Sequence, residues 1–336
     1  MGTVFAEILS VRARPSYFRI ILFLIAGHFA VATTAVEAQR PIVIEIDNDA
    51  LNVGVLGSPS DGEYSHGMRL FLPVGGRSPM GRWLFPDLAV CRGGERLDAC
   101  QDWTLVLGHQ IYTPGTNYKR FWPERRPFAG WLGASMHTGV HTERLDHQLT
   151  LALGVTGTPS LAEPVQRWFH DMLGEGTSRG WKGQLASEPT IGIAYRGALR
   201  PAEYRLGQSS TLRVRPTWCA GVGTVRTEVG AGLVGAIEFG AGGAAEWPGI
   251  EATRPTAPVY LLGGISGRMV AGDLFLDGGF FHQGPSVGHE PFVYVAEVGA
   301  GIHLQGRRIE WRVINTSRLY PTQPGPHTYT TIAIVQ

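Results

Sequence analysis

Apolar and polar residues alternate along much of this chain. Apolar residues take every second position, with polar or small residues between them, in the segments 149–155, 212–218, 292–304 and 309–313. A period of two is the side-chain period of a β-strand, and such segments recur from near Ile42 to near Thr330. We count about twelve of them, an even number as in bacterial outer-membrane barrels. The pattern predicts an all-β fold, a transmembrane antiparallel β-barrel.

One segment departs from this alternation. Between residues 163 and 173 the apolar residues recur at helical spacing: Val165, Trp168, Phe169, Met172 and Leu173. Gln166 and His170 lie four positions apart and therefore share one face of the predicted helix. On residue type alone, a histidine beside aromatic residues is more often packed than catalytic. We nevertheless take this face as the candidate active site, because of the neighbouring motifs described below.

The first 38 residues have the features of a secretory signal peptide. Three arginines precede the apolar run 20–31, and small residues at 36–38 offer a cleavage site before Gln39. No later segment supplies about 20 uninterrupted apolar residues for a membrane-spanning helix. We therefore predict a signal peptide over 1–38 and an exported barrel domain over 39–336, located in the outer membrane of a bacterium.

The charged residues and cysteines restrict the possible partners and contacts of the chain. The chain has 29 Lys plus Arg and 28 Asp plus Glu, and removing 1–38 leaves 26 of each, so nothing favours a nucleic-acid partner. Three arginines fall on lumen-facing positions and are expected to form ion pairs inside the barrel: Arg213, Arg215 and Arg312. Cys91 and Cys100 could pair in an oxidising compartment. Cys219 is expected to be buried or lipid-facing.

Oxygen-bearing side chains gather near the start of the domain. Asn48 and Asp49 are followed by the segment 61–67, Asp-Gly-Glu-Tyr-Ser-His-Gly. Carboxylate and amide oxygens suit Ca²⁺. Neighbouring residues in a regular strand point to opposite faces, so Asn48 and Asp49 can share a site only at a strand end or a bulge. The alternative is a polar turn between two strands.

Paired basic residues and paired histidines are further candidates. Arg125 and Arg126 could bind phosphates through forked hydrogen bonds, or lie in an exposed loop. His137 and His141 share a face and could bind a metal, although a polar hairpin end is the simpler interpretation.

These motifs resemble, in the same order, those of the outer-membrane lipid A 3'-O-deacylases, the LpxR family. The matching segments are Asn48–Asp49, 61–67, 107–114, 126–131 and 166–188. The resemblance implies a twelve-stranded barrel and a calcium-dependent esterase that removes the 3'-linked acyloxyacyl chain of lipid A.

The resemblance also implies roles for individual residues. His170 would be the general base, with Asn48, Gln166 and Ser65 as further catalytic-site residues; Ser65 stands where family members often have Thr. The remaining implied roles are lipid head-group binding by Arg125 and Arg126, and calcium binding by Asp49 and Glu175.

The expected partners are lipid A or lipopolysaccharide as substrate and the surrounding outer-membrane lipids, with the protein a monomer. Two alternatives remain open at this point. One is an outer-membrane phospholipase that uses Ser65 or another serine as its nucleophile. The other is a non-enzymatic channel or structural barrel.

Overall fold

The computed structural model describes residues 41–49, 62–91, 99–114, 123–173, 180–240, 257–304 and 306–336. The predicted signal peptide and Glu175 lie outside these ranges, so both stay predictions.

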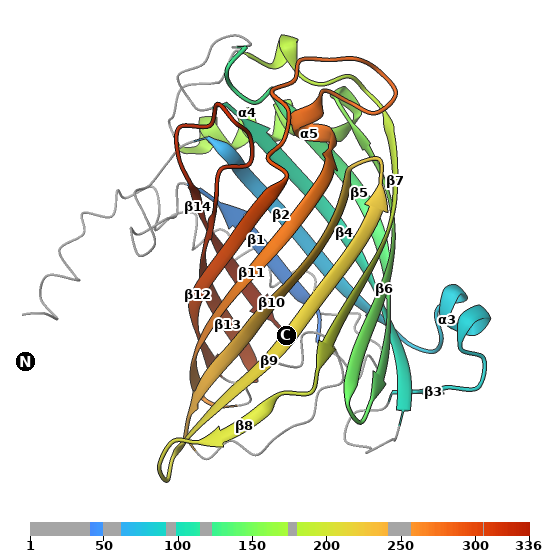
Figure 1. Cartoon of the computed structure of the whole chain (residues 1–336), viewed down its shortest axis with the longest axis vertical. Helices are drawn as coiled ribbons and strands as arrows, with labels where there is room; N and C mark the ends of the chain where they lie inside the picture. Colours follow the sequence, from blue (N-terminus) through green and yellow to red (C-terminus); the bar gives the residue numbers. More distant parts are fainter. Residues whose placement is uncertain are drawn as a thin grey trace, which may run out of the picture.

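Within the described residues, twelve antiparallel strands form a closed barrel, as the alternation predicts (Figure 1). Around the ring the order is β10, β11, β12, β13, β14, β1, β2, β4, β5, β6, β7 and β9, and the pairing of β9 with β10 closes it. Their bounds are β1 Val43–Asn48, β2 Glu63–Val74, β4 Ala99–Thr113, β5 Ala129–Thr142, β6 Leu145–Thr156, β7 Pro189–Leu199, β9 Ser210–Gly223, β10 Arg226–Phe239, β11 Val259–Asp273, β12 Phe292–Leu304, β13 Arg307–Thr316 and β14 His327–Val335. Two short strands, β3 Ala89–Val90 and β8 Ala202–Arg205, pair outside the ring with β4 and β9.

The two faces of the strands differ as the alternation requires. In β12, Phe292, Val298 and Ile302 are exposed on the outer wall, where lipid replaces water. The three predicted lumen arginines do form ion pairs: Arg213 with Glu203 and Glu238, Arg215 with Asp146, and Arg312 with Glu45, Glu297 and Glu310. Cys219 differs from our expectation, because it is half-buried and lines the cavity inside the barrel.

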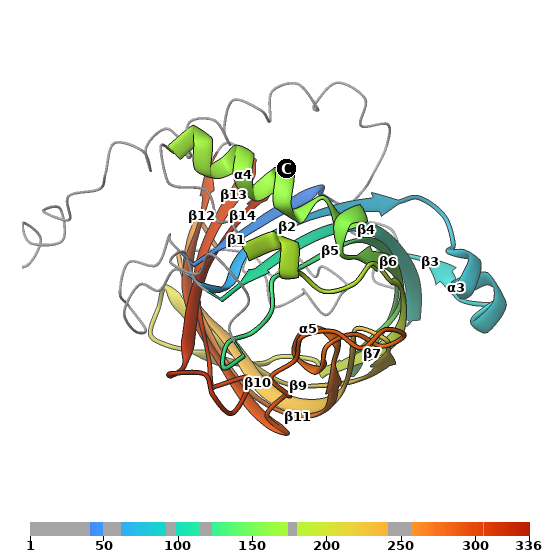
Figure 2. The same cartoon turned by 90° about the horizontal axis from the view of Figure 1, so that it is seen from above.

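One end of the barrel carries two helices, α4 Ala162–Leu173 and α5 Leu274–Asp277 (Figure 1). We call it the α4 end; β1 ends and β2 begins there. Seen from above, α5 lies inside the circle of strand ends (Figure 2). Leu274 and Phe275 are buried there in one cluster with Ala129 and Leu185, so an apolar cluster lies at this end of the barrel. None of the described helices is long and apolar enough to cross a membrane.

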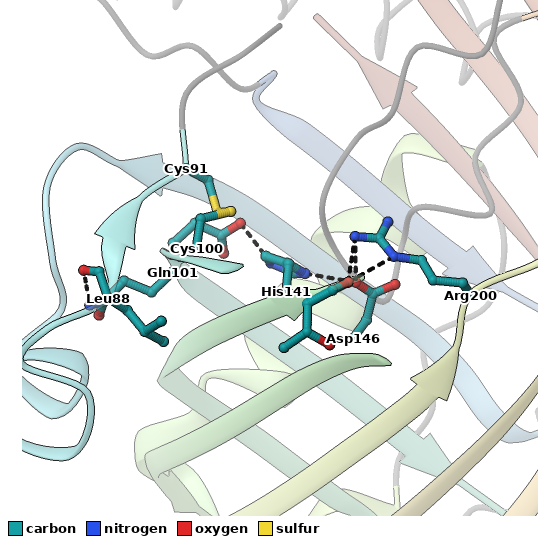
Figure 3. The surroundings of a disulfide bond; sticks show 9 residues. Leu88, Cys91, Cys100, Gln101, His141, Asp146 and Arg200 are labelled. Carbon is teal, nitrogen blue, oxygen red and sulfur yellow. Dashed lines mark hydrogen bonds and ion pairs between the residues drawn. A yellow bond between two sulfur atoms is a disulfide. The ribbon is translucent and has the colours of Figure 1, made fainter. Parts of the chain in front are cut away.

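The opposite end carries α3 Pro79–Leu84 and a disulfide between Cys91 and Cys100, the pairing that the sequence allowed (Figures 1 and 3). His141 lies beside this disulfide, and its two ring nitrogens contact Asp102 and Asp146, each at 3.0 Å. His141 therefore belongs to a network of charged side chains at a hairpin end, the simpler of its two interpretations.

Candidate functional site

Asn48 and Asp49 lie where strand β1 ends, the arrangement that a shared site requires. Asn48 is the last residue of β1, and its side-chain nitrogen donates to the carbonyl oxygen of Ser65 at 3.0 Å. Asp49 follows the strand, and its carboxylate accepts from the backbone N–H of Gly62 at 2.7 Å. Both side chains are almost fully buried. The two residues therefore hold the start of β2 against the end of β1.

A bulge at Ser65 shapes the start of β2. Tyr64 pairs with Tyr112 and His66 pairs with Ile111, so Ser65 is an extra residue without a partner in β4. Its hydroxyl oxygen forms a hydrogen bond with the hydroxyl oxygen of Thr113, 2.6 Å away. The bulge thus presents the serine side chain and backbone carbonyl at the end of the barrel, beside Asn48.

Helix α4 is fixed to the barrel by its first half. Ala162 packs against β4 and the following loop in a buried cluster with Ile111, Phe128 and Trp181. Gln166 accepts a hydrogen bond from the indole N–H of Trp181 at 2.7 Å. This contact explains why a glutamine stands on the inner helix face, since a buried amide needs partners.

His170 lies one turn further along α4 and is 8% exposed. The preceding residue, Phe169, contacts the ring of His66, with 5.7 Å between the ring centroids. His66 follows Ser65 in β2, so the C-terminal half of α4 lies beside the bulge. From above, α4 runs along the rim above β1 and β2 (Figure 2).

The two arginines have different environments. Arg126 is only 2% exposed; its guanidinium lies 4.3 Å from the ring centroid of Tyr112 and 3.7 Å from Glu63. Arg125 is a quarter exposed and lies 4.0 Å from the same carboxylate. Of the pair, Arg125 is therefore the one whose charge reaches solvent.

Glu63 connects several segments of this end and was not singled out by the sequence. Its carboxylate accepts from the hydroxyl of Tyr320 at 2.7 Å, besides pairing with Arg126. Burial raises the pKa of Tyr320, and its hydrogen bond to Glu63 raises it further. Glu63 also has a left-handed backbone, with φ 73°, which is uncommon outside glycine. The bulge at Ser65 thus begins from a strained residue that buried contacts hold in place.

The α4 end therefore gathers seven of the eight residues selected from the sequence: Asn48, Asp49, Ser65, Arg125, Arg126, Gln166 and His170. The eighth, Glu175, is outside the described residues. Thr113, Trp181 and Glu63 join them through the contacts above. No short-range spacing could have identified Glu63, because its partner Tyr320 is 257 positions away.

Known proteins with a similar sequence pattern and fold identify the family of this chain. The family model described as "Outer membrane protein LpxR" matches residues 18–335, almost the whole chain. This chain belongs to the LpxR family. Among solved structures, LpxR from Salmonella typhimurium is similar, with a TM-score of 0.69 and 16% identity over 88% of this chain and 99% of that chain. Comparison with curated protein sequences finds no match.

The solved structures of other proteins are less similar. The β domain of the Bordetella autotransporter BrkA matches with a TM-score of 0.44 and 10% identity, over 88% of this chain and 98% of that one. Family membership places the protein in the outer membrane and identifies its fold as that of LpxR.

Proposed function

We propose that this LpxR-family protein is a calcium-dependent esterase that removes the 3'-linked acyloxyacyl chain of lipid A. The observation that supports this best is the contact of Phe169 with His66, which brings the helix of His170 to the strand end of Asn48 and Ser65. The helix of the candidate base and a group of oxygen donors thus lie at the same end of the barrel.

The proposed chemistry is hydrolysis by water. The imidazole of His170 accepts a proton from water as the water oxygen attacks the ester carbonyl. When the tetrahedral intermediate breaks down, the imidazolium returns this proton to the sugar oxygen that leaves. The products are a free acyloxyacyl acid and a 3'-hydroxyl, and no covalent acyl-enzyme is formed.

The donor set at the end of β1 fits a hard cation. The carboxylate of Asp49 and the amide oxygen of Asn48 are the kinds of ligand that Ca²⁺ takes, and no sulfur lies among them. The hydrogen bond from Gly62 to Asp49 fixes the orientation of that carboxylate. When bound, calcium would polarise the ester carbonyl and stabilise the developing oxyanion.

The remaining residues orient the substrate and the base in this proposal. Gln166, held by Trp181, supports the helix turn that carries His170. Arg125 offers its charge to a phosphate of the glycolipid head group, whereas Arg126 holds Glu63 and the start of β2. The acyl chains stay in the membrane while the ester reaches the polar rim.

The bulge at Ser65 does not favour the phospholipase alternative. Between described residues the Ser65 hydroxyl pairs with Thr113, whereas a nucleophilic serine needs a base within hydrogen-bond reach. The decisive experiment is mass spectrometry of lipid A and phospholipids from cells that express the wild type or His170→Ala. We expect loss of the 3' acyloxyacyl mass with the wild type and intact lipid A with the variant. Lysophospholipid beside intact lipid A would reject the proposal.

A further inference from the structure

A buried carboxylate holds the loop between α5 and β12. Glu188 is 2% exposed, and its carboxylate accepts from three successive backbone N–H groups, those of Phe280 at 2.9 Å, Phe281 at 3.1 Å and His282 at 2.7 Å. Hydrogen bonds between a carboxylate and N–H groups are among the stronger ones in proteins. The loop is therefore held in one conformation.

The backbone conformations at Gly279 and at Glu188 both favour this contact. Gly279 has a φ of 109°, and a Cβ there would come 2.8 Å from the Glu188 carboxylate, so only glycine fits. Glu188 itself is tied to β6, because its N–H and C=O both bond to Thr156. The loop thus has a fixed position relative to the barrel wall.

This fixed loop exposes two large aromatic side chains. Phe280 and Phe281 are 62% and 59% exposed, and their rings form an edge-to-face pair with centroids 5.0 Å apart. No Asp, Glu, Lys or Arg occurs between residues 278 and 288. Two phenylalanine rings held in water forgo the stabilisation that burial of apolar surface brings. An apolar environment that covers them would provide this stabilisation.

The position of the pair identifies that environment. Glu188 immediately precedes β7, whose outer face begins with the exposed residues Ile191 and Ile193. In an outer-membrane barrel such residues face lipid, and aromatic residues flank the apolar band where it meets the head groups. Phe280 and Phe281 therefore lie next to the edge of that band at the α4 end, on a loop without Asp, Glu, Lys or Arg.

We propose that Phe280 and Phe281 insert into the head-group boundary of the membrane at the α4 end of the barrel, and that Glu188 sets their depth. The occupant of this surface is membrane lipid. The proposal depends on the membrane location of the barrel and not on its catalytic activity, so the two can fail independently.

Spin-label accessibility in proteoliposomes of phospholipid and lipopolysaccharide tests the insertion. In a Cys219→Ser background, a nitroxide is attached at Phe281→Cys, at Ile193→Cys on the outer wall, or at Arg318→Cys on an exposed loop at the same end. Oxygen concentrates in lipid and a nickel chelate in water. We expect the oxygen-to-nickel ratio at 281 to approach that at 193 and to exceed that at 318 several-fold.

Two results would overturn the insertion. One is a ratio at 281 equal to that at 318, which would place the pair in water. The other is shielding from both reagents, which would mean that protein covers it.

The role of Glu188 is tested by adding Glu188→Gln to the variant labelled at 281. We expect the ratio to fall and the spectral lines to narrow; an unchanged ratio would reject this role. Heat-dependent gel mobility verifies that each variant is folded.

Discussion

The ring of Phe169 in α4 lies against the ring of His66 in β2, with 5.7 Å between their centroids. This pair joins the helix that carries His170 to the bulge that carries Ser65. Phe169→Ala should therefore lower kcat/KM for lipid A roughly threefold to tenfold, because aromatic pairs contribute about 0.5–1.5 kcal/mol. The matched control is Trp168→Ala on the same helix, because Trp168 is 58% exposed. Equal effects of the two substitutions would contradict a specific role for the contact.

The Ser65 hydroxyl should be helpful but not essential. Ser65→Ala removes its hydrogen bond to Thr113, a loss of about 1 kcal/mol, and should reduce activity several-fold. Ser65→Thr keeps the hydroxyl and should retain most activity, and Thr113→Val should resemble Ser65→Ala. Deacylation assays with purified variants measure this. Complete inactivity of Ser65→Ala alone would indicate a nucleophile instead.

Substitution of Arg126 should lower the stability of the barrel, whereas substitution of Arg125 should weaken substrate binding. Arg126→Ala leaves Glu63 buried without its main counter-charge and should destabilise the barrel by about 3–5 kcal/mol in denaturant unfolding. Adding Glu63→Gln should recover part of this loss, because the two residues are coupled. Arg125→Ala should unfold normally and raise the KM for phosphorylated lipid A. A normal unfolding midpoint for Arg126→Ala would refute the assignment.

Calcium should bind through Asp49. Chelation should abolish deacylation and added Ca²⁺ should restore it, while Asp49→Ala should lose calcium binding in titration calorimetry. Asp171→Asn is the control, since Asp171 is an exposed acid on α4 directly after His170. Full activity of the Asp49→Ala variant after chelation would remove the metal from the mechanism.

The hydrogen bonds between the Glu188 carboxylate and the loop 280–282 should weaken as pH falls and should not weaken as pH rises. Burial raises the pKa of the Glu188 carboxyl, but hydrogen bonds from the N–H groups of residues 280–282 and from His282 outweigh burial and hold the pKa below its usual value. A lowered pKa means that the contact stabilises the loop above the unfolded value of about 4.3 and is lost as pH falls through the folded value. The nitroxide at 281 should stay immobile from neutral pH to about 5 and become mobile only in stronger acid. Mobility that begins close to neutral pH would contradict the role of Glu188.

The strand pattern could be predicted from the sequence because lipid and lumen impose opposite polarity on neighbouring residues. The helix that carries Gln166 and His170 could also be predicted, because residues four positions apart lie on one side of a helix. The expected position of Cys219 was wrong. A small apolar residue is compatible with either face of a strand, and here it faces the lumen.

Other features depend on contacts that no local pattern records. Helix α5 has local start and stop signals in Asp273 and Gly278, but its position inside the barrel depends on the cluster that Leu274 and Phe275 form with Ala129 and Leu185. The burial of the loop residue Arg126 likewise depends on Glu63 in β2 and Tyr112 in β4. Arg125 and Arg126 therefore look equivalent in the sequence and differ in the structure.

The apolar side chains around α5 have a consequence for the cell. Apolar side chains at this end oppose the passage of hydrated ions and other polar solutes along the barrel axis. We therefore expect expression of the protein to leave the permeability barrier of the outer membrane intact.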